Sequence, residues 1–248
     1  KSKEKILGVV WDGTGFGEDQ AIWGGEFFNY EKHKMKRLSH FEYVDWIAAD
    51  KMAKEPRLSL LSMLSDSERE TVKHKFSETE WKIYNKMLEG NDLKTSSVGR
   101  LFDAVASLLQ IIDKTSYEGE AAMLLENQAR SYQGDVFADF LADLEYENIP
   151  TKRLIAALQK AKNEGVSVPQ IASSFIHTLA LVILKIAKQH DYGTIACSGG
   201  VFQNSVLVEK LSQLSQKRGM KLKFNRILSS NDENISFGQL CYYQHIKN

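Results

Sequence analysis

The sequence predicts an α/β fold that carries a large, mainly helical insertion, and three observations support this. Segments with the apolar, β-branched composition of strands occur in residues 1–43 and again in residues 191–248. The intervening residues 44–190 place their apolar side chains at helical spacing. Three prolines in 248 residues leave room for long helices. The expected order of three strands, a block of helices and then strand–helix–strand–helix is typical of α/β domains.

Residues 1–43 predict a meander of three strands. Residues 6–11 are apolar and β-branched, as in a buried strand, and they are followed by the glycine-rich segment 12–17, which is expected to form the tip of a hairpin. A second strand is expected over 21–28, bent or bulged at its glycine pair, and a third over 35–43. A glycine-rich turn therefore follows directly on a buried strand.

Residues 44–190 predict several helices. The clearest covers 98–112, where apolar residues recur every three or four positions behind a run of three hydroxyl residues that can cap the helix. Ser77 and Glu80 have the spacing of a capping box. Pro169 suits the first turn of the longest apolar helix of the chain.

The C-terminal part, residues 191–248, predicts a return to alternating strands and helices. The expected elements are a strand over 194–197, a helix over 201–217, a strand over 221–227 and a closing helix that ends near 245. Ser230 or Asn231 is expected to cap that closing helix. Together with the two preceding parts, this gives one domain over residues 1–248.

Composition excludes several classes of protein. Basic and acidic residues both number 32, so the chain lacks the positive charge of a nucleic-acid binder, and no nucleic-acid partner is expected. No uninterrupted apolar run reaches the roughly 20 residues of a membrane span, so no membrane association is expected. The two cysteines, Cys197 and Cys241, form no disulfide framework, which indicates a reducing, cytoplasmic location. Neither has a cationic sequence neighbour, and no catalytic residue is predicted.

Two glycine-containing turns are candidate anion sites. The segment 12–17 places the carboxylate of Asp12 beside backbone N–H groups that could hold phosphate oxygens, although the pattern alone favours a plain turn. The segment 198–200 lies between a strand and a helix, where ligands bind in open α/β sheets. Asn204 would then be able to reach a sugar or base. A tight turn packed against the sheet explains that second segment equally well.

Two polar groups have both a structural and a functional interpretation. Residues 231–234 are acidic at a helix start, and their spacing favours capping over half of a metal site. The helix expected over 98–112 has a polar face, for which a solvated stripe is the favoured interpretation. That face consists of Arg100, Asp103, Ser107 and Gln110.

Five short segments follow one another in a recognisable order along the chain. They are VVWDGTGFG at 9–17 with IWGGE at 22–26, TSSVGRLFDAV at 95–105, SYEGEAA at 116–122, CSGGVFQN at 197–204, and ND at 231–232 with ISFGQ at 235–239. In this combination the chain resembles the C-terminal part of the HypF family, the carbamoyltransferases of nickel–iron hydrogenase maturation. The resemblance extends over essentially the whole chain, and residues 44–90 are the least recognisable part.

The resemblance implies a fold and a set of site residues. HypF proteins are similar in this region to the TsaD proteins of tRNA threonylcarbamoyladenosine synthesis, which have an actin-like (ASKHA, RNase H-like) fold of two related halves around a nucleotide, and this chain resembles the second half. The implied nucleotide-binding residues are Asp12, Gly13, Thr14 and Gly15 at the phosphates, Asp103 and Gly119 at the ribose or base, and Gly199, Gly200 and Asn204 around the rest of the pocket. The implied metal ligands are Asp12 and Asp232.

The chain departs from the family pattern at two places near the implied metal. The family has a His-x-x-x-His pair before the glycine-rich loop, and this sequence has none. Two carboxylates alone should bind a transition metal weakly, because imidazoles supply much of such a site's affinity, so iron, zinc and magnesium all remain open. The family also has two glycines where Glu233 and Asn234 stand here, which makes the role of Asp232 less secure than that of Asp12.

The resemblance implies a carbamoyltransferase. Carbamoyl-adenylate, made from ATP, would bind between the two halves, and the carbamoyl group would pass to the C-terminal cysteine of the partner protein HypE. The N-terminal half of the same protein would be a second partner, without which this half is not expected to turn over. Two alternatives stay open: an O-carbamoyltransferase of the same fold that acts on a small molecule, and a non-catalytic binding fragment. An Asp103→Ala variant with unchanged nucleotide affinity would favour the last.

Overall fold

One mixed β-sheet organises the molecule. The computed structural model describes residues 5–31, 34–135, 138–142, 145, 147–225 and 227–246. Seven strands of these residues pair in the order β4-β5-β2-β1-β6-β7, and β3 pairs with β2 as well. Their bounds are β1 Ile6–Phe16, β2 Ile22–Glu31, β3 Lys34–His40, β4 Val44–Asp45, β5 Lys94–Thr95, β6 Thr194–Ser198 and β7 Lys221–Phe224. Because β1 pairs antiparallel with β2 and parallel with β6, it joins the N-terminal meander to the C-terminal strands.

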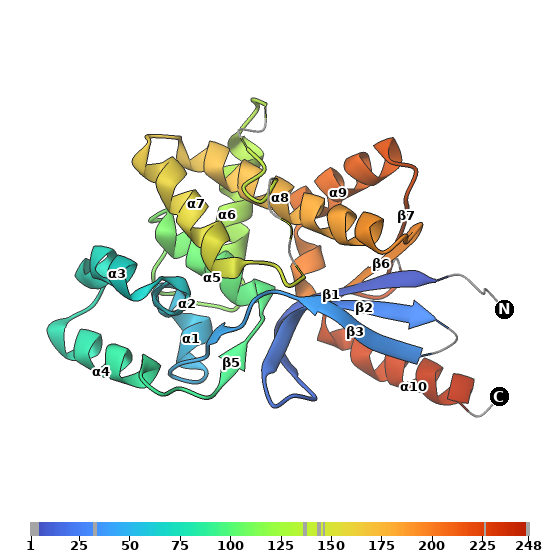
Figure 1. Ribbon diagram of the computed structural model, residues 1–248, viewed down its shortest axis with the longest axis horizontal. Coiled ribbons are helices and arrows are strands. Elements are labelled where there is room, and N and C mark those ends of the chain that lie inside the picture. Colours follow the sequence, from blue (N-terminus) through green and yellow to red (C-terminus); the bar gives the residue numbers. More distant parts are fainter. Residues whose placement is uncertain are drawn as a thin grey trace.

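The helices are distributed unequally over the sheet. They are α1 Lys51–Lys54, α2 Pro56–Met63, α3 Asp66–Arg69, α4 Glu78–Leu88, α5 Val98–Leu108, α6 Glu120–Ser131, α7 Thr151–Asn163, α8 Val168–Gln189, α9 Ser205–Lys217 and α10 Ile235–Ile246, with short 3₁₀ turns η1 Glu70–Lys75, η2 Gly200–Gln203 and η3 Asp232–Asn234. Helices α8 and α9 lie on one face of the strands, α10 lies on the other, and α1 to α7 form a lobe beside them (Figure 1).

The core begins at the central strand β1, whose side chains alternate between the two faces of the sheet. Leu7, Val9 and Trp11 are fully buried on one face, as the apolar pattern of this segment predicts. The Trp11 ring meets Phe27 edge-on and stacks on Phe202 at 5.6 Å between ring centroids. This aromatic contact joins β1, β2 and η2, so it fixes the C-terminal end of β1.

Helix α8 is the longest helix and runs through the core. It is 22 residues long, and its mean hydropathy reaches 1.6, which meets the length and composition of a membrane-crossing helix. Polar residues such as His177 and Lys185 interrupt this helix, so it holds no uninterrupted apolar run of the length expected of a membrane span. Because 78% of its most apolar window is buried, the composition is accounted for by its place in the core.

Two of the predicted helices are shorter than expected. The helix predicted over 98–112 ends at Leu108, because Gln110 adopts a left-handed conformation with φ of 60° that an α-helix does not accommodate. The helix predicted over 201–217 is divided into η2 and α9, and Asn204 lies between them as the N-cap of α9. The two-residue strands β4 and β5, inside the stretch predicted as helical, were not predicted.

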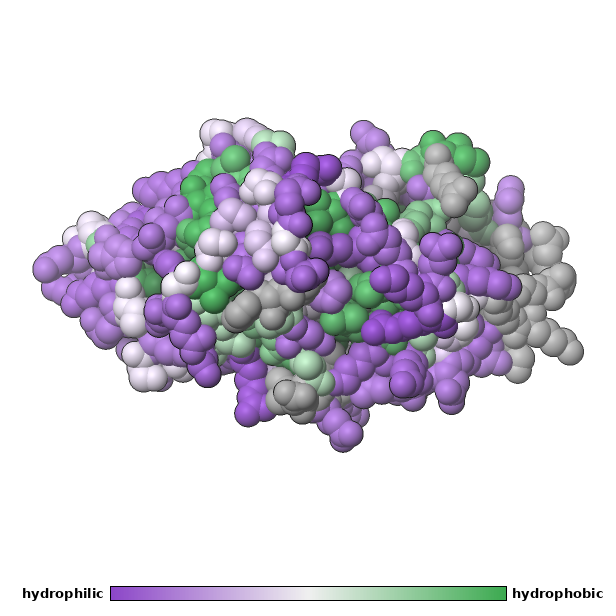
Figure 2. Space-filling model, turned by 90° about the horizontal axis from the view of Figure 1, so that it is seen from above, coloured by the Kyte–Doolittle hydropathy of each residue, from purple (hydrophilic) through white to green (hydrophobic). Residues whose placement is uncertain are grey.

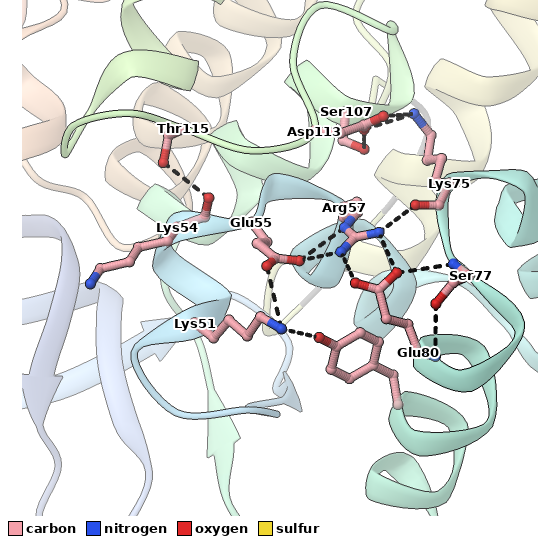
Figure 3. Close-up of polar contacts among 11 residues, drawn as sticks. Lys51, Lys54, Glu55, Arg57, Lys75, Ser77, Glu80, Ser107, Asp113 and Thr115 are labelled. Carbon is pink, nitrogen blue, oxygen red and sulfur yellow. Dashed lines mark hydrogen bonds and ion pairs between the residues drawn. The ribbon is translucent and has the colours of Figure 1, made fainter.

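A buried arginine joins three elements of the helical lobe (Figure 3). The Arg57 side chain is 3% exposed and donates hydrogen bonds to the carboxylates of Glu55 and Glu80 and to the carbonyl of Lys75. Its guanidinium also lies 4.6 Å from the centre of the Phe76 ring. Glu80 in turn belongs to the predicted capping box at the start of α4, which is confirmed. The start of α2, the end of η1 and the start of α4 are therefore fixed to one another.

The same network continues to the end of α5. Lys75 Nζ lies 2.8 Å from Asp113 Oδ1, which also accepts a hydrogen bond from Ser107 Oγ at 2.6 Å (Figure 3). On the other side, Lys51 donates to the hydroxyl of Tyr84. These contacts attach the lobe to α5, the helix whose first turn reaches the candidate site.

Candidate functional site

The ends of β1 and β6 lie side by side, which brings the two glycine-containing segments together. The parallel pairing places Val10 opposite Ser198. Beyond this pair, Asp12 Oδ1 accepts a hydrogen bond from Gly13 N at 2.7 Å, and its Oδ2 accepts one from Gly200 N at 3.1 Å. One carboxylate therefore connects segments that are 188 positions apart in the sequence.

The expectation that segment 12–17 forms the tip of a hairpin is wrong. Strand β1 continues through most of this segment after a bulge between Trp11 and Gly15. The tip lies further on, where Gly17 N donates to Ala21 O at 3.0 Å. The glycines at 13 and 15 therefore belong to a bulged strand, and bulges of this kind are common next to functional sites.

The first turn of α5 packs directly on the Asp12 backbone. The Ser97 hydroxyl donates to Asp12 O at 2.9 Å and accepts from Arg100 N at 3.1 Å, so it caps the helix and holds the strand end at the same time. A Cβ on Gly99 would lie 2.9 Å from Gly13 Cα. Glycine is required at 99 because the two backbones approach this closely.

A cavity of about 570 Å³ lies between the end of β1, α5, α6, η2 and η3. Six of the nine predicted nucleotide-binding residues line it. Both predicted metal ligands line it as well, and one of them, Asp12, is also among the six. The six are Asp12, Gly13, Asp103, Gly119, Gly200 and Asn204, and the other metal ligand is Asp232. Its walls include the N-termini of several helical elements, where the first backbone N–H groups have no partner within the helix itself.

The other three predicted residues, Thr14, Gly15 and Gly199, line a second cavity of about 410 Å³. Asp12 and Asp232 line both cavities, so the two spaces meet at these carboxylates. The predicted phosphate residues are thereby divided between two adjoining spaces.

Arg100 and Asp103 are buried, and the interpretation of this helix face as a solvated stripe is wrong for them. Their side chains are 10% and 6% exposed, and Arg100 Nε lies 3.0 Å from Asp103 Oδ2. Burial raises the pKa of the Asp103 carboxyl to about 7, against the opposing charge of Arg100. Of the other two residues on that face, Ser107 is buried and Gln110 is exposed beyond the helix end.

Unpartnered polar atoms gather at this cavity. Eight buried side-chain nitrogens and oxygens of the described residues lack a hydrogen-bond partner, and four of them belong to residues that line it. These four are Arg100 Nε and Nη1, Asp103 Oδ2 and Asn204 Nδ2. Buried polar groups are normally paired, so this concentration indicates a place where a polar ligand completes the hydrogen bonding.

Asn204 has one end engaged and one end available. Its Oδ1 accepts a hydrogen bond from Leu207 N at 2.9 Å, which caps α9. Capping fixes the side chain, and Nδ2, the other end of the same amide, is left as a buried donor. The predicted contact to a sugar or base stays a prediction, and the geometry leaves a donor for it.

Glu26, which lines the second cavity, was not among the predicted site residues. It is 2% exposed, accepts hydrogen bonds from Ser96 Oγ and Gly25 N, and burial raises the pKa of its carboxyl. A signal was available, because Glu26 is the one charged residue in the segment 21–28, which is otherwise apolar or glycine. A buried acid in such a place must be hydrogen-bonded.

The residues that the structure describes do not make up a complete metal site. Within the described residues, no three or more histidine, cysteine, aspartate or glutamate side chains cluster closely enough to hold a metal ion. Asp12 already accepts hydrogen bonds with both of its oxygens, and Asn231 Oδ1 accepts one from Glu233 N at 3.3 Å, which confirms capping at this helix start. Asp12 and Asp232 can at most contribute oxygen ligands.

A thiol nucleophile is also disfavoured at the site. Cys197 directly precedes the segment 198–200, but it is buried, and burial raises the pKa of its thiol. A thiol that stays protonated is a poor nucleophile. The unpartnered donors and acceptors at the cavity support the binding and orientation of a polar ligand.

Comparison with known proteins gives the family. Residues 8–239 match the family model described as "Carbamoyltransferase, Kae1-like Domain, second subdomain". The chain is 29% identical over 261 aligned residues to the carbamoyltransferase HypF of Synechocystis sp., covering 96% of this chain and 34% of that protein. It is 30% identical to a probable carbamoyltransferase HypF of Methanocaldococcus jannaschii, covering 94% of this chain and 32% of that protein.

A solved structure agrees with these matches. The structure titled full-length HypF in the phosphate- and nucleotide-bound form superposes with a TM-score of 0.85 at 25% identity, and the match covers 99% of this chain and 40% of that one. The chain spans about a third of the length of the curated relatives named above. The family expected from the five segments is confirmed: this chain belongs to the HypF carbamoyltransferases, as the second subdomain of their Kae1-like domain.

Proposed function

We propose that this chain is the part of a HypF-type carbamoyltransferase that holds a carbamoyl-adenylate made from ATP. In this proposal it is the second half of an actin-like domain, folded as one unit over residues 1–248 with the helical block 44–190 as an insertion. The observation that carries the proposal is the cavity at the end of β1, where four of the eight unpartnered buried polar atoms gather. A nucleotide has both the donors and the acceptors that these atoms lack.

Each predicted residue receives a role that follows from its place. Gly13, Gly200 and the start of α5 lie against the phosphate oxygens, with Thr14, Gly15 and Gly199 on the adjoining side. The Asp12 carboxylate accepts from the N–H groups of Gly13 and Gly200 and so holds these two segments in place. Asp103 accepts from the ribose hydroxyls, and Asn204 Nδ2 donates to the sugar or base. Gly119, which has φ of 80° at the start of α6, lets the chain turn next to the ligand.

The reaction needs no nucleophile from this chain. The thiolate of the C-terminal cysteine of HypE attacks the carbamoyl carbon, the C–S bond forms, and the bond from that carbon to the phosphate oxygen breaks, so that AMP leaves. The cavity residues contribute by orienting the acyl phosphate and by stabilising the negative charge of the leaving group. A buried, protonated Cys197 is compatible with this division of labour.

We propose that this chain supplies only part of the ligands of a divalent cation, which is iron, zinc or magnesium. Asp12 and Asp232, which line both cavities, supply two oxygen ligands, and the remaining ligands come from outside this chain. When bound, such a cation polarises a carbonyl or phosphoryl oxygen.

The remaining half of the domain is the proposed partner for the exposed face of α10. Ile235, Phe237, Leu240, Tyr242 and Tyr243 are each 54–64% exposed on this helix. Figure 2 views the molecule from the side opposite to α10 and shows a mostly hydrophilic face with small apolar patches. A helix with this many exposed apolar residues indicates an interface.

We place the whole protein in a reducing cytoplasm, with neither nucleic acid nor membrane as a partner.

Asp103 offers a direct test of the proposal. Replacing Asp103 with alanine is expected to weaken AMP binding by about 10- to 100-fold, because ribose hydroxyls lose a buried acceptor. Isothermal titration calorimetry on the purified chain measures this loss, and an exposed-site variant such as Asp66→Ala serves as the control. Unchanged AMP affinity in Asp103→Ala would contradict the proposed site. In the full-length protein, mass spectrometry of a HypE C-terminal peptide would follow carbamoyl transfer.

A further inference from the structure

One positively charged side chain lines the cavity and has no role in the proposal above. Arg100 is the single basic side chain among the described residues that line it. Six acidic residues also line it: Asp12, Asp103, Glu118, Glu126, Asp232 and Glu233. An anionic group that enters this space is repelled by the carboxylates and attracted by one guanidinium.

The hydrogen-bonding capacity of Arg100 is largely unused. Its Nε and Nη1 are buried without a hydrogen-bond partner, although a guanidinium can donate five hydrogen bonds. Its Nη2 lies 3.9 Å from the position that a Cβ on Gly13 would occupy, so the guanidinium extends over the bulge of β1. The side chain is thus held next to the backbone that the proposal assigns to phosphate oxygens.

The nearby carboxylate does not account for this arginine. Asp103 Oδ2 lies 3.0 Å from Arg100 Nε, yet the geometry is not that of a hydrogen bond, and both atoms stay unpartnered. Burial holds the pKa of this carboxyl near 7, so around neutral pH it neutralises the guanidinium only in part. A ligand that carries both an anion and hydroxyl donors would satisfy both side chains at once.

We propose that Arg100 binds the negatively charged phosphoryl group of the nucleotide beside Gly13, while Asp103, released from their mutual ion pair, accepts the ribose hydroxyls. This inference rests on the proposed nucleotide site and adds the residue that distinguishes a nucleotide from a nucleoside. Arginine suits the task, because its planar fork pairs with two phosphate oxygens at once.

Comparing AMP with adenosine, on the wild-type chain and on Arg100→Gln, isolates the phosphoryl contact. The wild-type chain is expected to bind AMP about 10- to 100-fold more tightly than adenosine, as for charge-assisted hydrogen bonds in a buried site. In Arg100→Gln this preference should fall to about two-fold while adenosine affinity is retained. Arg100→Lys, which keeps the charge and is the safer variant to fold, should retain part of the preference. Arg153→Gln, an exposed arginine on α7, is the matched control.

The outcomes separate the inference from the proposal beneath it. Loss of the AMP preference with adenosine binding retained supports the role of Arg100. An equal loss for AMP and adenosine, or no loss for either, overturns that role and leaves the nucleotide site standing. A wild-type chain that binds neither compound overturns the nucleotide site and the inference together. Thermal melting of each variant verifies that the compared chains are folded.

Discussion

Two buried arginines in this molecule have opposite surroundings. Arg57, in the helical lobe, donates to two carboxylates and a carbonyl and packs on the Phe76 ring. Arg100, at the start of α5, lies beside one carboxylate without forming a hydrogen bond to it. The two side chains are similarly removed from water, at 3% and 10% exposure, so burial alone does not distinguish them.

The difference separates a structural cluster from a binding site. The desolvation of Arg57 is offset inside the folded chain, so its network contributes to holding the lobe together. The desolvation of Arg100 and Asp103 is offset only in part, by their opposite charges and without a hydrogen bond between them. Such a cost persists in a fold where a ligand supplies the missing partners. Substitution of Arg57 should therefore lower stability and leave binding unchanged. Substitution of Arg100 should weaken binding and change stability little.

The largest expected effect is at Arg57. Arg57→Gln leaves Glu55 with only the half-exposed Lys51 as a cationic partner and leaves the Lys75 carbonyl without its buried donor. It should lower the free energy of unfolding by about 3–5 kcal/mol. Urea denaturation measures this loss, and the folded fraction should bind AMP as the wild type does. Arg69→Gln is the matched control, since Arg69 pairs with an Asp66 side chain that is 94% exposed, and it should cost below about 1 kcal/mol. Equal losses in the two variants would contradict the structural role given to the Arg57 network.

An intermediate effect on stability is expected at Asp103, where the charged side chain destabilises the folded state. The folded carboxyl titrates near 7 and the unfolded one near 3.8, so the folded state holds its proton more tightly, and ionisation above the unfolded pKa destabilises it. Relative to Asp103→Asn, the wild type should therefore lose about 2–3 kcal/mol of stability between pH 5 and pH 8. Urea denaturation of both chains across this range gives the difference. A difference that stays flat with pH would mean that the carboxyl does not titrate in this window.

The smallest effect on stability is expected at Arg100. Arg100→Gln removes a guanidinium with two unpartnered buried nitrogens, and Asp103 can respond by taking up a proton. The free energy of unfolding should fall by about 1 kcal/mol or less, well below the loss for Arg57→Gln. Should the two losses be equal, the contrast between a satisfied and an unsatisfied arginine would be refuted. The same denaturation series covers both variants.

Local sequence pattern predicts most elements and some of their ends. The alternation in β1, the capping box at Ser77 and Glu80 and the long apolar α8 all follow from side chains close together in sequence. The early end of α5 was not predictable from the apolar spacing, because it depends on the left-handed conformation of Gln110. The strands β4 and β5 exist only through pairing with distant segments.

The site shows the same limit more sharply. The resemblance to a known family supplied Asp103 and Gly119, and the turn pattern had already indicated Asn204. The structure brings all three to one cavity. The helical pattern alone predicts a solvated polar face for α5. Spacing does not distinguish an arginine that is buried from one that is exposed at the same helical position. Which of the two applies is decided by β1, whose bulge lies against the first turn of α5.

The Asp12 carboxylate also affects the order in which the molecule matures. It bridges Gly13 and Gly200, so the cavity is complete only when segments 188 positions apart in the sequence have met. During synthesis, the ribosome releases the first of these residues long before the second, and the site forms among the last features of the fold. A ligand that binds this cavity would therefore bind only finished molecules and would withdraw them from unfolding by mass action. Ligand availability in the cell would in this way influence how many copies of the protein survive.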